Sequence, residues 1–561
     1  MTTPIVAPVA IAGAGPVGLT LALDLAARGI RSVIIEQRRP DERPSVKCNH
    51  VSSRTMEIFR RLGLADDIRS AGLPDDYPND VVVRTRATGF ELTRLPIPSR
   101  RRRFNASDGI DAGWPTPEPP HRINQIFFEP LLYHRAARTP EISILNRTRF
   151  EGHAQNDDRV LITAHDLGSG KDIAIESRYL IGCDGARSSV RRQIGAHLVG
   201  ESFIQRVQST YIRAPELLGL IPSPAWMSYL YNPERAGNLV AIDGRETWLI
   251  HNYLLPHERD SDEVNRDRCI RTLLGVDDEF EYQIRAREDW VGRRLVANTF
   301  RDRRVFICGD AAHLWVPYAG YGMNAGIADA MNLSWMLAAH LQGWAPAEIL
   351  DAHEAERHPT TEEVSRFVAK HAASAISERT TLPSNIEVNS AAGAESRARV
   401  GRAAFDLHVQ QFACAGLNYG YCYRESPIVV HDGEAPPPYT MRDYIPSTVP
   451  GCRTPHFWLK DGRSLYDAMG PNFTLLRFDP HVSVDALMSA AARRDVPLEL
   501  LDIGPRDARP PYRHALLLNR PDFHVAWRGD AIPADPDRLI DLVRGSLLRA
   551  EGITHPEAGP A

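Results

Sequence analysis

The sequence lacks the cysteine pairs, the long apolar runs and the leader segment that mark several other classes of protein. Its seven cysteines are scattered, and no two have the C-x-x-C spacing of a zinc ribbon or a thioredoxin redox motif. No apolar stretch reaches membrane-spanning length. The N-terminus has no charged segment of the kind that opens a signal peptide. These absences disfavour a secreted disulfide scaffold and a membrane protein, so we expect a cytoplasmic location.

A large charge excess is also missing. The 66 basic and 71 acidic residues leave a formal charge of -5, which gives no general attraction to nucleic acid or to anionic membranes. One basic run, Arg100–Arg103, is interpreted as a solvated loop. No internal repeat is apparent, and no group of residues has metal-ligand spacing, so no metal is expected. The length of 561 residues and the charged fraction of 24% suit a soluble protein of two to four domains.

What the sequence does contain is a glycine-rich turn at its start. An apolar strand at residues 9–12 is followed by three spaced glycines and an apolar helical stretch. The glycines permit a tight turn, backbone approach to a pyrophosphate and close packing of helix on strand. The pyrophosphate then meets the helix N-terminus, and an acid that ends the next strand accepts hydrogen bonds from ribose hydroxyls. The residues predicted to bind a dinucleotide here are Gly13, Gly15, Pro16, Val17, Gly18, Glu36 and Gln37.

Two later segments combine an apolar strand with neighbouring glycine and aspartate residues. The first, residues 179–188, contains Asp184 next to Gly185, and the second, residues 305–313, contains Gly309 next to Asp310. Any one of the three segments would be a weak signal by itself. Their combination, in this order, separates a flavin monooxygenase from ordinary dinucleotide-binding enzymes.

The three segments closely resemble the single-component FAD-dependent aromatic hydroxylases, the class that includes phenol, hydroxyphenylpropionate and hydroxybiphenyl hydroxylases. The resemblance runs over most of the chain. It implies that Asp184 serves both FAD and the reduced nicotinamide, and that Asp310 holds the ribityl chain. It also implies that backbone N–H groups face the pyrimidine end of the flavin, where they stabilise negative charge. The further positions that it places near FAD are Arg54, Gln125, Gly309, Pro317, Gly322, Met323 and Asn324.

The loop at residues 317–322 departs from the family pattern. It carries Tyr318, Ala319 and Tyr321 where small or polar residues are usual. The two tyrosines either line the substrate pocket or tune its hydrogen bonding, or they serve as packing residues. The departure leaves the identity of the substrate open, rather than the binding of a flavin.

The family chemistry asks for a group that helps to deprotonate a phenol, and His50 is the first candidate. A histidine titrates near working pH, and residues 47–51 should cross near the flavin. The alternative is a hydrogen-bonded structural histidine. Tyr231 and Tyr321 are further catalytic candidates, although each also fits a packing role. If Tyr229 and Tyr231 share a strand, they face the same side of it.

The order of predicted elements gives an α/β fold with an inserted antiparallel layer. The resemblance implies that a Rossmann-like FAD-binding domain alternates with an antiparallel substrate sheet. A small α/β domain follows a proline-rich boundary near residue 435. Its residues 453–456, 462–467 and 520–528 resemble the thioredoxin-like domain appended to many of these hydroxylases. Cys452 is the only cysteine of that last domain, so we expect it to support folding or a homodimer rather than redox chemistry. The predicted parts are FAD binding at about 1–80, 120–195 and 300–435, substrate binding at about 80–120 and 195–300, and the thioredoxin-like domain at 440–561.

The resemblance implies a monooxygenase that uses FAD, with NADPH or NADH as co-substrate. Reduced FAD would react with O2 to a C4a-hydroperoxide that hydroxylates a small phenolic or related aromatic substrate. The protein would position the ring and exclude water. One alternative is a flavin oxygenase acting on an N-heteroaromatic, quinol, polyketide or ketone substrate. Another is a non-catalytic FAD-binding interaction protein.

Overall fold

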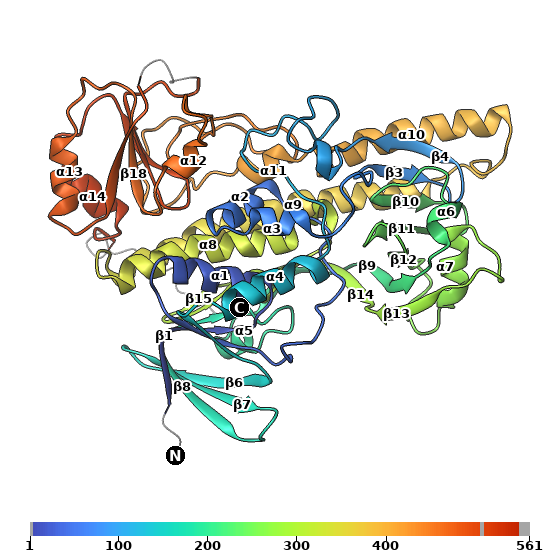
Figure 1. Ribbon diagram of the computed structural model, residues 1–561, viewed down its shortest axis with the longest axis horizontal. Coiled ribbons are helices and arrows are strands. Elements are labelled where there is room, and N and C mark those ends of the chain that lie inside the picture. Colours follow the sequence, from blue (N-terminus) through green and yellow to red (C-terminus); the bar gives the residue numbers. More distant parts are fainter. Residues whose placement is uncertain (1–3, 505–509, 549–561) are drawn as a thin grey trace.

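The computed structural model describes residues 4–504 and 510–548. These residues form three β-sheets, of eight, nine and four strands. Figure 1 shows the two larger sheets on either side of a layer of long helices, with the smallest sheet in a separate unit at the C-terminal end. The chain therefore has an α/β architecture with an added antiparallel layer, as the order of predicted elements indicated.

The eight-stranded sheet carries the glycine-rich turn. Its centre is parallel, in the order β16-β8-β1-β2-β5, and β6 and β7 form an antiparallel hairpin on β8. All four residues of β2 are buried, as expected for a parallel strand with both faces covered. The strands are β1 (Ile5–Ala12), β2 (Ser32–Ile35), β5 (Ile142–Leu145), β6 (Thr148–Gln155), β7 (Val160–Asp166), β8 (Asp172–Gly182), β15 (Arg301–Asp302) and β16 (Val305–Ile307).

The nine-stranded sheet is almost wholly antiparallel, and only the β3–β10 pair is parallel. On β10, Tyr229 and Tyr231 point to the same side with ring centroids 6.1 Å apart, as predicted. The strands are β3 (Val81–Arg84), β4 (Glu91–Leu95), β9 (Leu198–Arg213), β10 (Met227–Tyr231), β11 (Ala236–Ala241), β12 (Thr247–Tyr253), β13 (Gln283–Arg287), β14 (Trp290–Ala297) and β17 (His313–Trp315).

Long helices lie between the two large sheets. The central one, α8, is buried along most of its length and packs on α1 and α9. Because α8 begins directly after residues 317–321, its N-terminus projects from the loop that was expected to hold the flavin. The main-body helices are α1 (Pro16–Ala27), α2 (Ser53–Arg61), α3 (Ala65–Ser70), α4 (Gln125–Ala137), α5 (Ser189–Gln193), α6 (Leu217–Leu220), α7 (Arg266–Leu274), α8 (Gly322–Leu341), α9 (Asp351–Thr380), α10 (Ala391–Phe412) and α11 (Ala415–Tyr419), with short 3-10 turns η1 (Arg100–Arg102), η2 (Gly309–Ala311), η3 (Tyr318–Gly320) and η4 (Ala347–Leu350).

The C-terminal unit has the strand order β19-β18-β20-β21, with β18 and β19 parallel and the other pairs antiparallel. The unit is therefore a small mixed α/β domain. The main body covers the sheet, because Trp335 and Trp344 both pack edge-on against Phe473. The elements are β18 (Phe473–Arg477), β19 (Leu498–Asp502), β20 (Leu516–Asn519), β21 (Val525–Gly529), α12 (Leu465–Ala468), α13 (Asp485–Ala492) and α14 (Pro536–Val543).

Cys452 has a neighbour that the sequence did not reveal. Its Sγ lies 2.9 Å from the Sγ of Cys422, and the two residues face each other in an isolated antiparallel bridge. Cys422 precedes the proline-rich boundary. The thiol of Cys452 therefore meets a partner from outside its own domain, although it has no cysteine partner within that domain.

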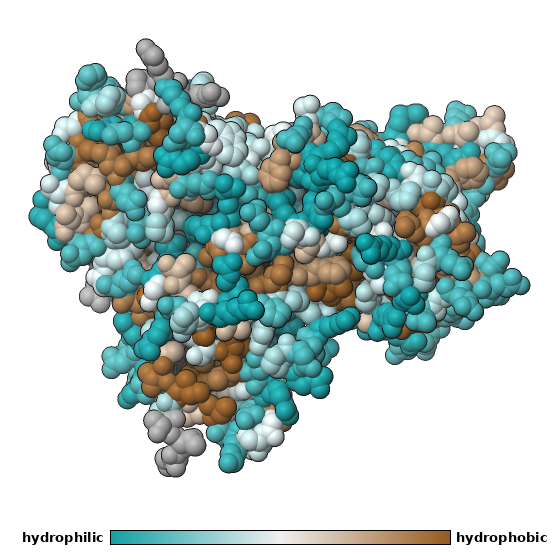
Figure 2. Space-filling view, in the orientation of Figure 1, coloured by the Kyte–Doolittle hydropathy of each residue, from teal (hydrophilic) through white to brown (hydrophobic). Residues whose placement is uncertain are grey.

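Figure 2 shows hydrophilic residues over most of the face in view, with separate apolar patches at the lower left, around β1 and β8, at the centre, and over the C-terminal unit. No helix in the described ranges is long and apolar enough to cross a membrane.

Candidate active site

The turn between β1 and α1 requires glycine at two positions, because the backbone passes very close to other backbone atoms there. A Cβ on Gly13 would lie 2.4 Å from the carbonyl oxygen of Cys183, and one on Gly18 would lie 2.1 Å from that of Gly13. Gly13 also has a φ of +105°, which favours glycine. At Gly15, by contrast, no heavy atom of the described protein lies within 4 Å of such a Cβ. Gly13 and Gly18 therefore shape the turn, while Gly15 leaves its outer surface open to a phosphate group.

The acid at the end of β2 is held against this turn. Glu36 is buried, and its Oε2 accepts a hydrogen bond from the Ala14 N–H at 2.7 Å. Arg38 bridges Glu36 and Glu129, and Glu129 in turn accepts from Gln125 Nε2 at 2.5 Å. Gln125 thus reaches the dinucleotide turn through Glu129 and Arg38. Gln37, also predicted to bind the cofactor, is exposed beside them.

The second segment presents one polar atom without a partner. Asp184 Oδ2 accepts from the backbone N–H groups of Ser189 and Val190, at 2.7 and 3.2 Å. Its buried Oδ1 has no hydrogen-bond partner among the residues that the structure describes. Because Asp184 also packs below Gly13, this oxygen is placed to accept from a cofactor bound at the turn.

The third segment is stabilised by hydrogen bonds with residues that were not predicted to belong to the site. Asp329, on α8, is fully buried, and its Oδ2 accepts from the Gly309 N–H at 3.1 Å and from His313 Nε2 at 2.7 Å. Its Oδ1 accepts from Arg357 Nε at 2.8 Å. Although burial raises the pKa of Asp329, the nearby charges of Arg357 and His313 hold it well below its usual value. This carboxylate fixes the turn on which Asp310 stands exposed.

The loop between β17 and α8 is locked to the segment around His50. Ala319 and Gly320 both have positive φ values, and a Cβ on Gly320 would lie 3.0 Å from the Cβ of His50. Asn324, in the first turn of α8, accepts from the Ser52 N–H at 2.9 Å and donates to the His50 carbonyl at 3.1 Å. The side chain of Asn324 is therefore structural. The first turn of α8 carries the backbone N–H groups of Gly322, Met323 and Asn324. Because these N–H groups have no partner within the helix, the N-terminus of α8 favours negative charge.

The structure places His50 directly beside the predicted flavin loop. Its Nδ1 lies 3.3 Å from the carbonyl oxygen of Ala319, which can only accept, so Nδ1 carries the hydrogen. The buried Nε2 has no hydrogen-bond partner within the described ranges and is left as an acceptor. Burial, followed by the positive charge of Arg122, lowers the pKa of His50 well below 6.5. The ring is therefore neutral at physiological pH and can accept a hydrogen bond from a phenol.

Tyr231 belongs to a hydrogen-bonded group on β10 of the nine-stranded sheet, the layer that was predicted to bind the substrate (the substrate sheet). Its hydroxyl lies 3.1 Å from His408 Nε2, and the Tyr229 hydroxyl accepts from Gln411 Nε2 at 3.0 Å. Gln411 also accepts from the Ala319 N–H at 3.1 Å, which connects these tyrosines to the flavin loop. Burial raises the pKa of Tyr231 well above 10, so its hydroxyl stays protonated. Tyr231 can donate or relay a hydrogen bond but cannot act as an ionised base.

The two loop tyrosines do different things. Tyr318 faces the substrate sheet, and its hydroxyl accepts from Arg379 Nη1 at 3.1 Å. Tyr321 lies in a buried cluster with Leu417 and Tyr421, and its hydroxyl donates to the Leu417 carbonyl at 3.1 Å. Of the roles considered for Tyr321, these contacts favour packing. Its catalytic role, one of the predictions, has no support in its surroundings.

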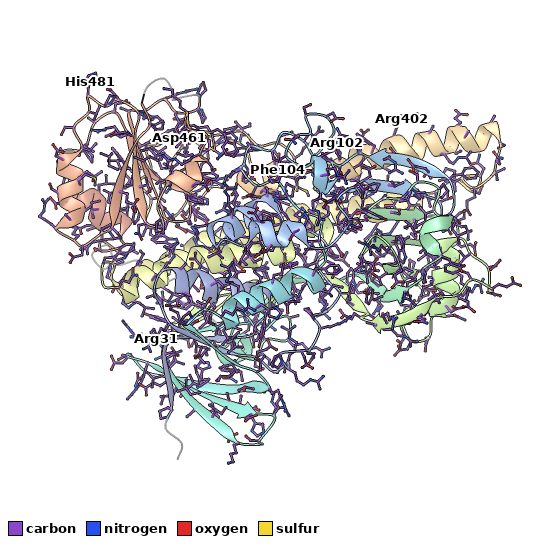
Figure 3. All side chains as sticks on the ribbon, viewed as in Figure 1. Arg31, Arg102, Phe104, Arg402, Asp461 and His481 are labelled. Atoms are coloured by element: carbon purple, nitrogen blue, oxygen red, sulfur yellow. The ribbon has the colours of Figure 1, made fainter. Side chains whose placement is uncertain are left out.

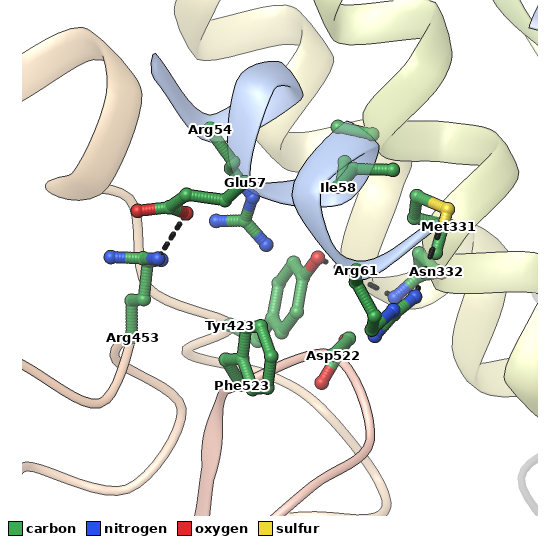
Figure 4. Close-up of a pocket in the computed structure, with 11 residues that line it drawn as sticks. Arg54, Glu57, Ile58, Arg61, Met331, Asn332, Tyr423, Arg453, Asp522 and Phe523 are labelled. Atoms are coloured by element: carbon green, nitrogen blue, oxygen red, sulfur yellow. Dashed lines mark hydrogen bonds and ion pairs between the residues drawn. The ribbon is translucent and has the colours of Figure 1, made fainter. Parts of the chain in front are cut away.

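Arg54 lies away from the glycine turn. It sits on α2, where its guanidinium covers the Tyr421 ring at 4.7 Å and its Nη2 lies 2.9 Å from His524 Nε2 in the C-terminal unit. Figure 4 shows Arg54 among residues of α2, α8 and the C-terminal unit, with Glu57 paired to Arg453. The cavity that they line is about 20 Å³, room for a single water. It is too small for an aromatic substrate, and these contacts assign Arg54 to joining the two units.

Within the described ranges, no group of three or more histidine, cysteine, aspartate or glutamate residues could hold a metal ion. The polar groups gathered at the turn suit a dinucleotide instead. They are the open face of Gly15, the free Oδ1 of Asp184 and the exposed carboxylate of Asp310.

Two family models match the chain. One, described as the FAD binding domain, covers residues 6–368, and the other, described as the C-terminal part of aromatic-ring hydroxylases, covers residues 447–547. The chain belongs to the FAD-dependent aromatic-ring hydroxylases. The first match includes all three segments predicted to form the dinucleotide site, and FAD is the cofactor of this family.

Similar proteins span nearly the whole of this hydroxylase. The FAD-dependent monooxygenase apdD of Emericella nidulans is 30% identical, over 96% of this chain and 90% of its own. The phenol 2-monooxygenase of a Pseudomonas species is 28% identical, over 96% and 93%. The solved structure of the rebeccamycin biosynthetic enzyme RebC with reduced flavin is 33% identical, with a TM-score of 0.88, over 97% of this chain and 100% of that one.

Proposed function

We propose that this hydroxylase is an NAD(P)H- and O2-dependent monooxygenase that inserts one oxygen atom into a phenolic or related aromatic ring. The observation that carries the proposal is the position of His50. A neutral imidazole with a free acceptor nitrogen lies against the loop at residues 317–321. When bound, FAD would supply the activated oxygen.

The residues around this position would bind and orient the ring. His50 Nε2 would accept the phenol hydrogen, which makes the ring carbons ortho and para to the oxygen more electron-rich. The buried tyrosines of β10 would form the far wall and help to exclude water. The Gln411 bridge between Tyr229 and Ala319 would keep that wall at a fixed distance from the flavin loop.

A second candidate substrate is a larger polycyclic ring system, such as a quinol or polyketide. Support comes from relatives named for such compounds, including the tetracenomycin B2 monooxygenase-dioxygenase of Streptomyces olivaceus, which is 29% identical over 96% of this chain and 98% of its own. A screen of phenols, naphthols and polycyclic quinols, following NAD(P)H oxidation and product mass, separates the two candidates.

The oxygen that enters the product should come from O2. With ¹⁸O-labelled O2 and a substrate found in the screen, the product mass should rise by two units relative to the product made in unlabelled O2. Oxygen incorporation from water would rule out the monooxygenase proposal. A non-catalytic FAD-binding protein would show no substrate-stimulated NAD(P)H oxidation at all.

His50→Ala should keep the FAD but lose coupled hydroxylation. We expect a fall of about 10²-fold near neutral pH, the lower end of what proton transfer by a side chain contributes. The loss should shrink as the pH rises above the pKa of the phenol, where the substrate ionises without help. Turnover, product yield per NAD(P)H and flavin absorbance give the measurement. An equal loss at every pH, or no loss, would assign His50 a structural role.

A further inference from the structure

Two buried arginines beside His50 share a single carboxylate. Arg103 Nη1 and Arg122 Nη2 each lie 3.1 Å from Asp111 Oδ2, and the two arginine side chains are only 4% and 2% exposed. The other oxygen, Asp111 Oδ1, accepts from Trp114 Nε1 at 2.6 Å. Two guanidinium charges against one carboxylate leave this cluster with a net charge of about +1. Arg103 belongs to the basic run that was interpreted as a solvated loop. Its neighbour Arg102, labelled in Figure 3, is exposed, but Arg103 is buried, which corrects that interpretation for Arg103.

The same two arginines have hydrogen-bond donors to spare. Arg122 Nε and Nη1 and Arg103 Nε and Nη2 are buried without a hydrogen-bond partner anywhere in residues 4–504 and 510–548. Buried donors of a charged group are normally satisfied, because leaving them unpaired is costly. The surplus charge and the free donors together call for an anionic acceptor that is not part of the described protein.

The position of Arg122 shows where such an anion would lie. Val51 and His121 form an antiparallel bridge, which sets His50 opposite Arg122 on neighbouring strands. On its other side, the Arg122 guanidinium lies 4.9 Å from the centre of the Trp226 ring, and Trp226 directly precedes β10. Arg122 therefore stands between the flavin loop and the substrate sheet, where the aromatic ring of the proposed reaction would bind.

We propose that Arg122, supported by Arg103, binds an anionic oxygen of the aromatic substrate, either a carboxylate or a phenolate. This inference rests on the proposed function, because the ring itself is assigned by that function. The guanidinium offers two adjacent N–H groups, the geometry that pairs best with a carboxylate. With a phenolate, the same charge would favour the ionised form, whose proton is released to solvent. In both cases the enzyme would select anionic rings over neutral rings of equal size.

Arg122→Gln is a suitable test variant because the charges of the two remaining buried side chains, Arg103 and Asp111, cancel. Without Arg122, Asp111 keeps Arg103, so the variant has one buried cation and one buried anion. We expect its thermal stability to be equal to or above that of the wild type. Arg100→Gln provides the control, because Arg100 belongs to the same basic run but bonds to Asp75 and to the carbonyls of Arg69 and Ala71.

The first arm compares 1-hydroxy-2-naphthoate with its neutral carboxamide on the FAD-loaded enzyme. Binding is followed by the change in flavin absorbance, without NAD(P)H. If the carboxylate is the bound anion, Arg122→Gln should raise the Kd for the naphthoate by about 30-fold or more and the Kd for the amide by less than about twofold. Arg100→Gln should change neither value.

The second arm uses the carboxamide alone and records the ultraviolet difference spectrum of its phenol. If the bound anion is the phenolate, the wild type should show ionised ligand below the ligand's own pKa, and Arg122→Gln should not. Equal weakening of both ligands with no change in ionisation, no effect in either arm, or failure of both to bind the wild type at millimolar concentration would overturn the proposal. Because neither arm depends on turnover, failure of hydroxylation would be seen separately.

Discussion

Gly15→Ala should produce a folded protein that holds at least about tenfold less FAD than the wild type. Nothing in the described protein lies within 4 Å of a Cβ at this position, so the fold itself has room for the methyl group. The methyl would instead project from the turn where the pyrophosphate must approach the backbone. The ratio of flavin to protein absorbance after purification, together with thermal unfolding of the apoprotein, gives the measurement.

Gly18→Ala provides the contrast, because its Cβ would lie 2.1 Å from the Gly13 carbonyl oxygen. The Gly13 carbonyl cannot move away from this Cβ without disrupting the turn between β1 and α1. The variant should therefore lose stability as well as FAD. Gly219→Ala is the matched control, since no heavy atom lies within 4 Å of its Cβ and it is far from the turn in sequence. It should stay yellow and stable. Full FAD occupancy in Gly15→Ala would contradict the assignment of this turn to the pyrophosphate.

Asp329→Asn should destabilise the protein by about 3–5 kcal/mol, the usual cost of breaking a buried ion pair by removing one partner. The change removes the charge that balances Arg357, which is also fully buried, while it keeps nearly the same shape. We expect FAD to be lost with stability, because Asp329 also holds the Gly309 N–H that begins the Asp310 turn. Denaturant unfolding of the apoproteins measures the first effect, and flavin content measures the second. A loss below about 1 kcal/mol would mean that Arg357 finds another partner.

The same carboxylate predicts how stability depends on pH. The folded-state pKa of Asp329 lies well below the unfolded value of 3.8, chiefly because Arg357 offsets the effect of burial. The unfolded state therefore binds its proton first as the pH falls, and this stabilisation is present above about pH 4 and is lost progressively below it. Between pH 5 and pH 2, the wild type should lose more stability than Asp329→Asn. Parallel curves for the two proteins would contradict the assignment.

Elements whose geometry is local followed from the sequence. The glycine turn was predictable because the spacing of Gly13, Gly15 and Gly18 fits one backbone path between a strand and a helix, and because a carboxylate ends the next strand. The shared side of Tyr229 and Tyr231 followed from the two-residue period of a strand. These features depend on neighbours within a few residues, so the chain carries their signal directly.

Contacts between distant segments were decided by the tertiary structure. Arg54 contacts His524, which lies 470 residues further along the chain, and nothing in the local sequence indicated this contact. Tyr321, on the same loop as Tyr318, donates to the Leu417 carbonyl. The pairing of Asp329 with Arg357 and of Asp111 with both Arg103 and Arg122 likewise depends on segments that only folding brings together.

The physical reason is that burial and charge balance are properties of a site rather than of a residue. The basic run at residues 100–103 has the composition of a solvated loop, yet folding buries Arg103 beside Asp111. His50 has the residue type of a proton acceptor, but its neutral state is set by burial and by Arg122, 72 positions away in the sequence. The sequence by itself thus determined the family, the cofactor site and the strands that carry it. Only the tertiary packing decided which charges gather around His50.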